Sequence, residues 1–130
     1  MTVITKQRPK FLNLVVIKLP LAGFASILHR ISGIGLFLML PLLIWLLQLS
    51  LDSAESFGTL QAVIANPLVK LILLGLLWAF LHHFCMGIRI LLIDIQIGVE
   101  KEAASASAKA VLAVSLLLTA ILGLKLLGAY

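Results

Sequence analysis

The sequence predicts an all-α integral membrane protein with three transmembrane helices, and three observations lead to this prediction. Apolar residues make up 62% of the chain and charged residues only 12%, with a mean hydropathy of +1.21. A soluble globule needs more polar surface than that. Long apolar runs occur three times, separated by polar segments rich in turn-forming residues. A chain of 130 residues holds three spans of roughly 20 residues each, so we expect one membrane domain over residues 1–130.

The first predicted span covers about residues 21–49. It contains the uncharged run Ile31–Leu49, which is long enough to cross a hydrocarbon core of about 30 Å. Pro20 suits the start of a helix, where its missing N–H costs nothing, so the helix is expected to begin near Leu21. Pro41 lies inside the run and predicts a kink.

Two further spans follow, at about residues 68–94 and 105–127. The segment before the second span, "SLDSAESFGTLQAVIANP", contains Asp, Ser, Gly and Asn-Pro and predicts a loop with room for a short surface helix. The segment before the third span, "DIQIGVEKEAASASAK", predicts a short polar connection. Lys125 lies close enough to the end of the third span to reach the interface.

Charge asymmetry predicts the orientation in the membrane. Five cations precede or open the first span, whereas the following connection carries Asp52 and Glu55; the cations are Lys6, Arg8, Lys10, Lys18 and Arg30. By the positive-inside rule the N-terminus is cytoplasmic. The cations that keep the N-terminus in the cytoplasm account for the formal charge of +5, and no nucleic-acid partner is expected. The single Cys85, within an apolar stretch, predicts packing or lipid contact and excludes an internal disulfide.

Four ionisable side chains in or beside the spans need an explanation: His29, Arg30, His83 and Arg89. An ionisable residue at the centre of a span costs about 2.5–3.5 kcal/mol on insertion. Counted back from Asp94 at ~1.5 Å per residue, Arg89 lies about 8 Å deep and His83 about 17 Å deep. The two arginines can each reach the interface, but an imidazole near mid-membrane requires a partner in protein, lipid or cofactor.

A haem iron is one such partner for His83, and a satisfied core histidine is the alternative. The neighbouring His82 points ~100° away, so the two rings cannot ligate opposite faces of one iron. Gly87, one turn after His83, leaves room for a flat macrocycle or for close helix packing. The same depth count places His29 roughly 10 Å nearer the cytoplasm, which suits propionate contacts with Arg30 better than iron ligation.

Ser26 and Arg30 share one helix face, four residues apart, with Gly33 completing the stripe. A hydroxyl and a guanidinium together can hold a quinone carbonyl and stabilise the charge that develops on its oxygen during reduction. Interfacial polar residues beside a close helix contact are the alternative interpretation.

At these residues the chain resembles the cytochrome b556 family of anchors of succinate dehydrogenase, respiratory complex II, in proteobacterial membranes. The resemblance covers nearly the whole chain: "QRPKFLNL", "SILHRISG" at the first span and "HHFCMGIRILLID" at the second. In the family, S-x-x-H-R-x-[ST]-G and a later H-x-x-x-G-x-R…D pattern recur together. The chain departs from the family at Ile90, where relatives often carry a histidine, and His82 has no counterpart that assigns it a role.

The resemblance implies an electron-transferring anchor in the bacterial inner membrane that is not catalytic by itself. It implies a second small haem-binding anchor subunit, an iron–sulfur subunit and a flavoprotein subunit as partners. It also implies that His83 is one axial ligand of haem b, that His29 and Arg30 approach the propionates, and that Ser26 and Arg30 bind ubiquinone.

Three alternatives stay open at this point. A fumarate reductase-type anchor belongs to the same class, and a purely structural anchor without haem is also compatible. A small transporter normally carries an intramembrane carboxylate, whereas all five acidic residues of this chain lie in or beside connections.

Overall fold

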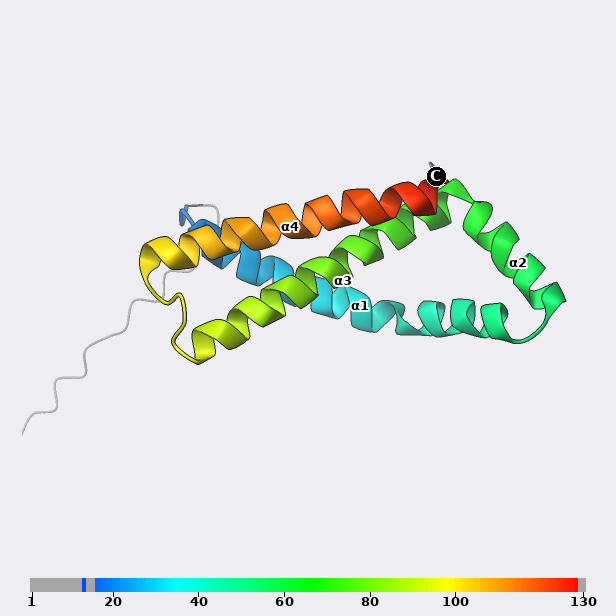
Figure 1. Ribbon diagram of the computed structural model, residues 1–130, viewed down its shortest axis with the longest axis horizontal. Coiled ribbons are helices and arrows are strands. Elements are labelled where there is room, and N and C mark those ends of the chain that lie inside the picture. The colour runs from blue at the N-terminus through cyan, green and yellow to red at the C-terminus, as the bar shows by residue number, and fades with distance from the viewer. Residues whose placement is uncertain (1–12, 14–15, 129–130) are drawn as a thin grey trace, which may run out of the picture.

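The computed structural model describes residue 13 and residues 16–128, and this part of the chain contains four α-helices and no β-strand. The helices are α1 (Leu21–Leu51), α2 (Ala54–Ala65), α3 (Pro67–Asp94) and α4 (Lys101–Leu127). The three long helices pack against one another, with α1 and α3 crossing and then diverging toward the ends that α2 joins (Figure 1). The all-α prediction is confirmed. The basic arm with Lys6, Arg8 and Lys10, and the terminal Tyr130, lie outside the described residues.

Three of the helices are long and apolar enough to cross a membrane, as predicted. They are α1, α3 and α4, with 31, 28 and 27 residues. At ~1.5 Å per residue each is at least about 40 Å long, so its ends extend beyond a hydrocarbon core of about 30 Å. Most of their large apolar side chains are exposed in the isolated chain, which is the surface that lipid or a partner helix covers.

Local sequence signals set most of the helix ends. Pro20 is the extended residue directly before α1, and α1 continues through Pro41 without interruption. Asn66 caps α3 by accepting a hydrogen bond from the Leu68 backbone N–H at 2.9 Å, and Pro67 is the first helical residue. α2 begins with a capping box in which Ser53 and Ser56 exchange hydrogen bonds, so the connection before α3 does contain a short helix.

α4 begins at Lys101, four residues earlier than the expected start at residue 105. The segment before residue 105 is polar, but Lys, Glu and Ala are strong helix formers. The negative charge of Glu102 in the first turn also stabilises the helix by interacting with the positive end of its dipole. The turn that separates α3 from α4 is made by Gln96 and Gly98, whose φ angles are 66° and 73°.

The small core of the chain lies where the three long helices meet. Ala25 of α1, Met86 of α3 and Ala108 of α4 are completely buried there, with Val111 beside them. Small residues on α1 and α4 allow the backbones to approach closely, which is the usual packing of membrane helices. This contact fixes the mutual position of the polar residues described next.

Candidate functional site

His83 lies at the contact between α3 and α1 and is held there by two hydrogen-bond partners on α1. Its Nδ1 is 3.1 Å from the backbone oxygen of His29 and 3.2 Å from Oγ of Ser32. Ser32 is buried, and its Oγ donates to the same His29 oxygen at 2.8 Å. The ring of His83 is therefore positioned by a residue pair one turn apart on the neighbouring helix.

These hydrogen bonds determine which nitrogen of His83 carries the proton. The Ser32 hydroxyl donates its hydrogen to the His29 oxygen, so both groups that face Nδ1 are acceptors and Nδ1 donates. In the neutral ring Nε2 is then unprotonated, and none of the described residues forms a hydrogen bond to it. A ring whose Nδ1–H donates to a carbonyl while the Nε2 lone pair is free is the usual form of a metal-binding histidine.

Gly33 provides the space that the His83 ring occupies. A Cβ atom built on Gly33 would lie 2.9 Å from Cε1 and 3.3 Å from Nδ1 of His83. Any side chain at this position would therefore displace the ring or the helix. Gly35, two residues later, has no atom within 4 Å of a built Cβ, so the requirement for glycine is specific to the turn that faces the histidine.

His29 lies closer to His83 than predicted. The two rings are stacked, with centroids 4.1 Å apart and planes 10° from parallel. The expected 10 Å difference in depth is wrong, because a depth counted along each helix separately does not include how the two helices cross. α1 begins at Leu21, ten residues before the uncharged run, and thereby carries His29 into the bundle beside His83.

Gly87 faces α1. The nearest atom to a Cβ built on Gly87 is Nε2 of His29, at 3.9 Å. Of the two interpretations of this glycine, the structure supports close helix packing, with the His29 ring covering the position.

Ser26 and Arg30 lie one turn apart on α1, as the helical spacing predicts. Arg30 is exposed and Ser26 is half-buried. Neither side chain makes a hydrogen bond or an ion pair with any residue in the described part of the chain. Both are thus available to a ligand or to a second chain, and the structure does not bring them into contact with His83.

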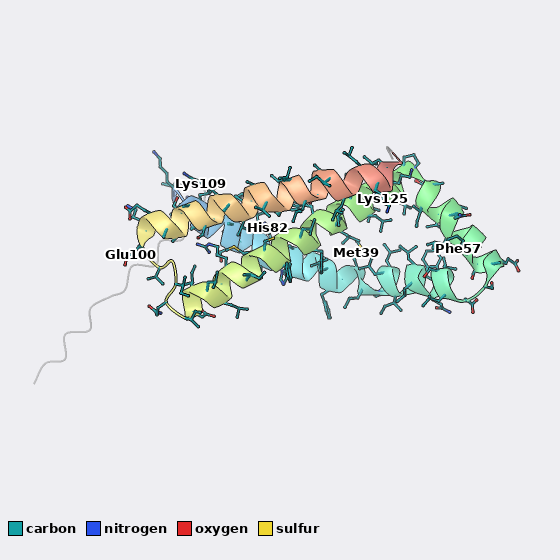
Figure 2. All side chains as sticks on the ribbon, in the orientation of Figure 1. Met39, Phe57, His82, Glu100, Lys109 and Lys125 are labelled. Atoms are coloured by element: carbon teal, nitrogen blue, oxygen red, sulfur yellow. The ribbon has the colours of Figure 1, made fainter. Side chains whose placement is uncertain are left out.

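The neighbouring His82 belongs to the core. It is completely buried, its Nε2 lies 3.4 Å from the Ala25 oxygen, and its ring stacks on Trp78 at a centroid distance of 5.4 Å. Figure 2 shows it in the middle of the bundle, where α3 passes the other long helices. Because the Ala25 oxygen accepts, Nε2 carries the proton, and the buried Nδ1 has no partner among the described residues.

Arg89 connects α3 to the first turns of α4. Its Nε donates to Ser107 Oγ at 2.9 Å, and its NH2 group donates to the Ala104 oxygen at 3.0 Å. The side chain is only 8% exposed, so it does not extend to the interface as the sequence allowed. Its third hydrogen bond goes from NH1 to Sδ of Met86 on its own helix at 3.9 Å, so the side chain stabilises the α3–α4 contact.

His83 offers one ring nitrogen, Nε2, that has no hydrogen-bond partner among the described residues. Within the described residues, no group of three or more His, Cys, Asp or Glu side chains comes close enough to hold a metal ion. A haem supplies its own equatorial nitrogens and needs only axial ligands from protein. The free Nε2 of His83 therefore fits the requirement of a haem and does not fit that of a bare metal ion.

Comparison with known proteins identifies the family. Residues 4–122 match the model of the succinate dehydrogenase/fumarate reductase transmembrane subunit. The chain is 36% identical over 112 residues to the succinate dehydrogenase cytochrome b556 subunit of Paracoccus denitrificans, covering 86% of each chain. It is 42% identical over 90 residues to that of Coxiella burnetii, covering 68% of this chain and 72% of the relative. Identity to the Rickettsia felis subunit is 33% over 120 residues, or 92% of this chain and 93% of the relative. The chain thus belongs to the family of succinate dehydrogenase/fumarate reductase transmembrane subunits.

Proposed function

We propose that this chain is a membrane anchor of succinate:quinone oxidoreductase in the bacterial inner membrane, where it binds haem b together with a second anchor subunit. The single observation that carries the haem assignment is the geometry at His83, whose Nδ1 lies within hydrogen-bond distance of the His29 oxygen and of Ser32 Oγ, while its Nε2 has no partner among the described residues. Family membership supports the coarser statement that the chain is a transmembrane subunit of such a complex.

His83 is the proposed axial ligand, and the second axial ligand comes from the partner anchor. The carbonyl of His29 and the hydroxyl of Ser32 favour the proton on Nδ1 and orient the ring. The side chains of His29 and Arg30 are the proposed partners of the propionates, since the cation of Arg30 offsets the cost of placing carboxylates in or beside the membrane. When bound, the haem supplies a one-electron carrier within the membrane.

Ser26 and Arg30 are the proposed ubiquinone ligands. Both are donors without a described partner, and they lie one turn apart on the same helix. Their hydrogen bonds to a quinone carbonyl would strengthen as negative charge develops on its oxygen, so they stabilise the reduced product more than the oxidised substrate. Electrons reach this site from the iron–sulfur subunit, which receives them from the flavoprotein. This chain by itself carries out no reaction; it completes the quinone site of the assembled enzyme.

The test of the haem assignment is His83→Ala in the assembled membrane complex. We expect loss of the haem absorption bands, because the variant removes the one ligand that this chain supplies. His82→Gln is the matched control, since it alters the adjacent residue and preserves a donor toward the Ala25 oxygen. The pyridine haemochrome assay gives haem per complex for each variant. Normal haem content and an unchanged spectrum in His83→Ala would reject the assignment.

A fumarate reductase-type anchor is the second candidate, because the matching family model covers both enzymes. The two differ in the direction of catalysis within the assembled complex. Relative rates of succinate oxidation by quinone and fumarate reduction by quinol, measured on the purified complex, distinguish them.

A further inference from the structure

We propose that Ser32 and Gly33 of α1 are positioning residues for His83, the proposed haem ligand on α3. The ring of the ligand is then held in place by a helix other than its own. This inference rests on the proposed function of His83. It concerns two residues that neither carry charge nor act as ligands.

The first step of the argument is the space left by Gly33. Contacts of 3.0–3.4 Å around a Cβ are already tight, and the built Cβ would approach Cε1 of His83 to 2.9 Å. The obstructing atom belongs to a rigid ring and not to the tip of a flexible chain. The ring is also confined on its face by the stacked ring of His29, so it cannot move away from Gly33 without losing its hydrogen bonds to α1.

The second step is the hydroxyl of Ser32. Serines 50 and 115 make the same local hydrogen bond to the carbonyl three residues earlier, at 2.6 Å and 3.1 Å. Ser32 makes that bond and in addition places its Oγ 3.2 Å from Nδ1 of His83. Because its hydrogen is already donated, it can only accept from the imidazole, and it thereby disfavours the tautomer that would carry the proton on Nε2.

Together the two residues perform distinct tasks. Gly33 sets where the ring lies, and Ser32, with the His29 carbonyl, sets which nitrogen is free. Partners of this kind around a metal-binding histidine typically change metal affinity by about 10–100-fold when they are mutated. We therefore expect measurable effects on haem retention even though neither residue touches iron.

The experiment compares four variants in the full complex, purified from membranes. Gly33→Ala adds one methyl group against the ring, and Gly35→Ala adds the same group into open space. Ser32→Ala removes the acceptor, and Ser32→Thr keeps it. The readouts are haem per complex, the electron paramagnetic resonance signal of the oxidised haem, and the rate of haem transfer to apomyoglobin.

We expect Gly33→Ala and Ser32→Ala to lose haem about 10-fold faster than the wild type and to shift the resonance signal of the oxidised haem. Gly35→Ala and Ser32→Thr should match the wild type. Should Gly33→Ala fail to assemble, Ser32→Ala decides the question, because it adds no volume to the helix contact.

Two different results would overturn the two proposals separately. If His83→Ala loses the haem while Ser32→Ala retains a wild-type signal and haem-loss rate, and Gly33→Ala behaves like Gly35→Ala, then the positioning role is wrong and the ligand assignment stands. If His83→Ala keeps a normal haem spectrum, the ligand assignment itself fails.

Discussion

Arg30 is exposed on α1, and within the described residues its guanidinium forms neither a hydrogen bond nor an ion pair. Arg89 is the opposite case, since it is buried and donates to two groups on α4. A charged side chain inside or beside a span is retained when it has a partner or a task. Arg89 has its partners on α4, and the proposed contact with quinone explains why Arg30 is retained.

Replacing Arg30 by Leu should therefore affect quinone chemistry, and haem binding through the proposed propionate contact, and leave succinate oxidation ahead of the membrane intact. We expect succinate-driven ubiquinone reduction to fall on the order of 10²-fold, because a charged donor toward the developing negative charge is lost. Succinate oxidation by an artificial dye that accepts electrons before the membrane should remain at the wild-type rate. Lys70→Leu removes a cation near the start of α3 and is the control. An equal loss in both assays would contradict the quinone role.

The sequence singles out His83 as a candidate ligand but does not predict its surroundings. His83 could be singled out because an ionisable side chain in mid-span is costly. The roles of Ser32 and Gly33 could not be predicted, because they depend on which face of α1 meets α3, and both faces contain small residues. The stack of His29 on His83 was missed for the same reason: depth along two separate helices does not reveal how they pack.

At the scale of the helices, α4 packs on α3 through a stripe of small residues. Ala108, Ser115, Thr119 and Gly123 are all buried along one face of α4. A Cβ built on Gly123 would lie 2.5 Å from Cδ1 of Leu74, so the Leu74 side chain of α3 packs directly onto this glycine. Such stripes permit van der Waals contact between helices where no hydrophobic effect drives their association.

We expect Gly123→Ile to lower the free energy of unfolding by about 1–3 kcal/mol, because a β-branched side chain overpacks this contact. Gly123→Ala should cost less, since the tip of the Leu74 side chain can rotate away. Gly75→Ile is the matched control, because a Cβ at Gly75 meets no atom within 4 Å. Thermal unfolding of the detergent-solubilised complex checks the order of stability of these variants. If Gly75→Ile and Gly123→Ile are equally destabilising, this packing argument fails.

Helix boundaries were predictable to within a few residues where capping or proline signals were present. Leu21 and Pro67 begin their helices directly at such signals. The polar connection predicted before the third span contains the first turns of α4, because alanine and charged helix formers extend the helix beyond its apolar part.

The whole molecule is a three-helix anchor with little core of its own. Its long helices meet around a few small residues, and their outer faces carry exposed Phe, Leu and Ile side chains. Such a surface requires lipid or a partner helix over most of its area. Hydropathy alone predicted this architecture, because every span must satisfy its backbone hydrogen bonds as a helix.

The predicted orientation places α2 outside the cytoplasm and the α3–α4 turn inside. In a Cys85→Ala background, Thr59→Cys and Val99→Cys each introduce a single exposed thiol, at α2 and at the turn before α4. A membrane-impermeant maleimide should label Thr59→Cys in spheroplasts and label Val99→Cys only after permeabilisation. The reverse pattern would contradict the positive-inside prediction.

The hydrogen bonds from His83 to α1 place the proposed haem site and the proposed quinone site on the same helix. Ser26 and Arg30 lie within seven residues of Ser32 and Gly33 on α1. A displacement of α1 when one site binds its ligand is therefore transmitted to the other site. Thermodynamic linkage then requires reciprocity: whatever factor quinone occupancy imposes on haem affinity, haem imposes on quinone affinity.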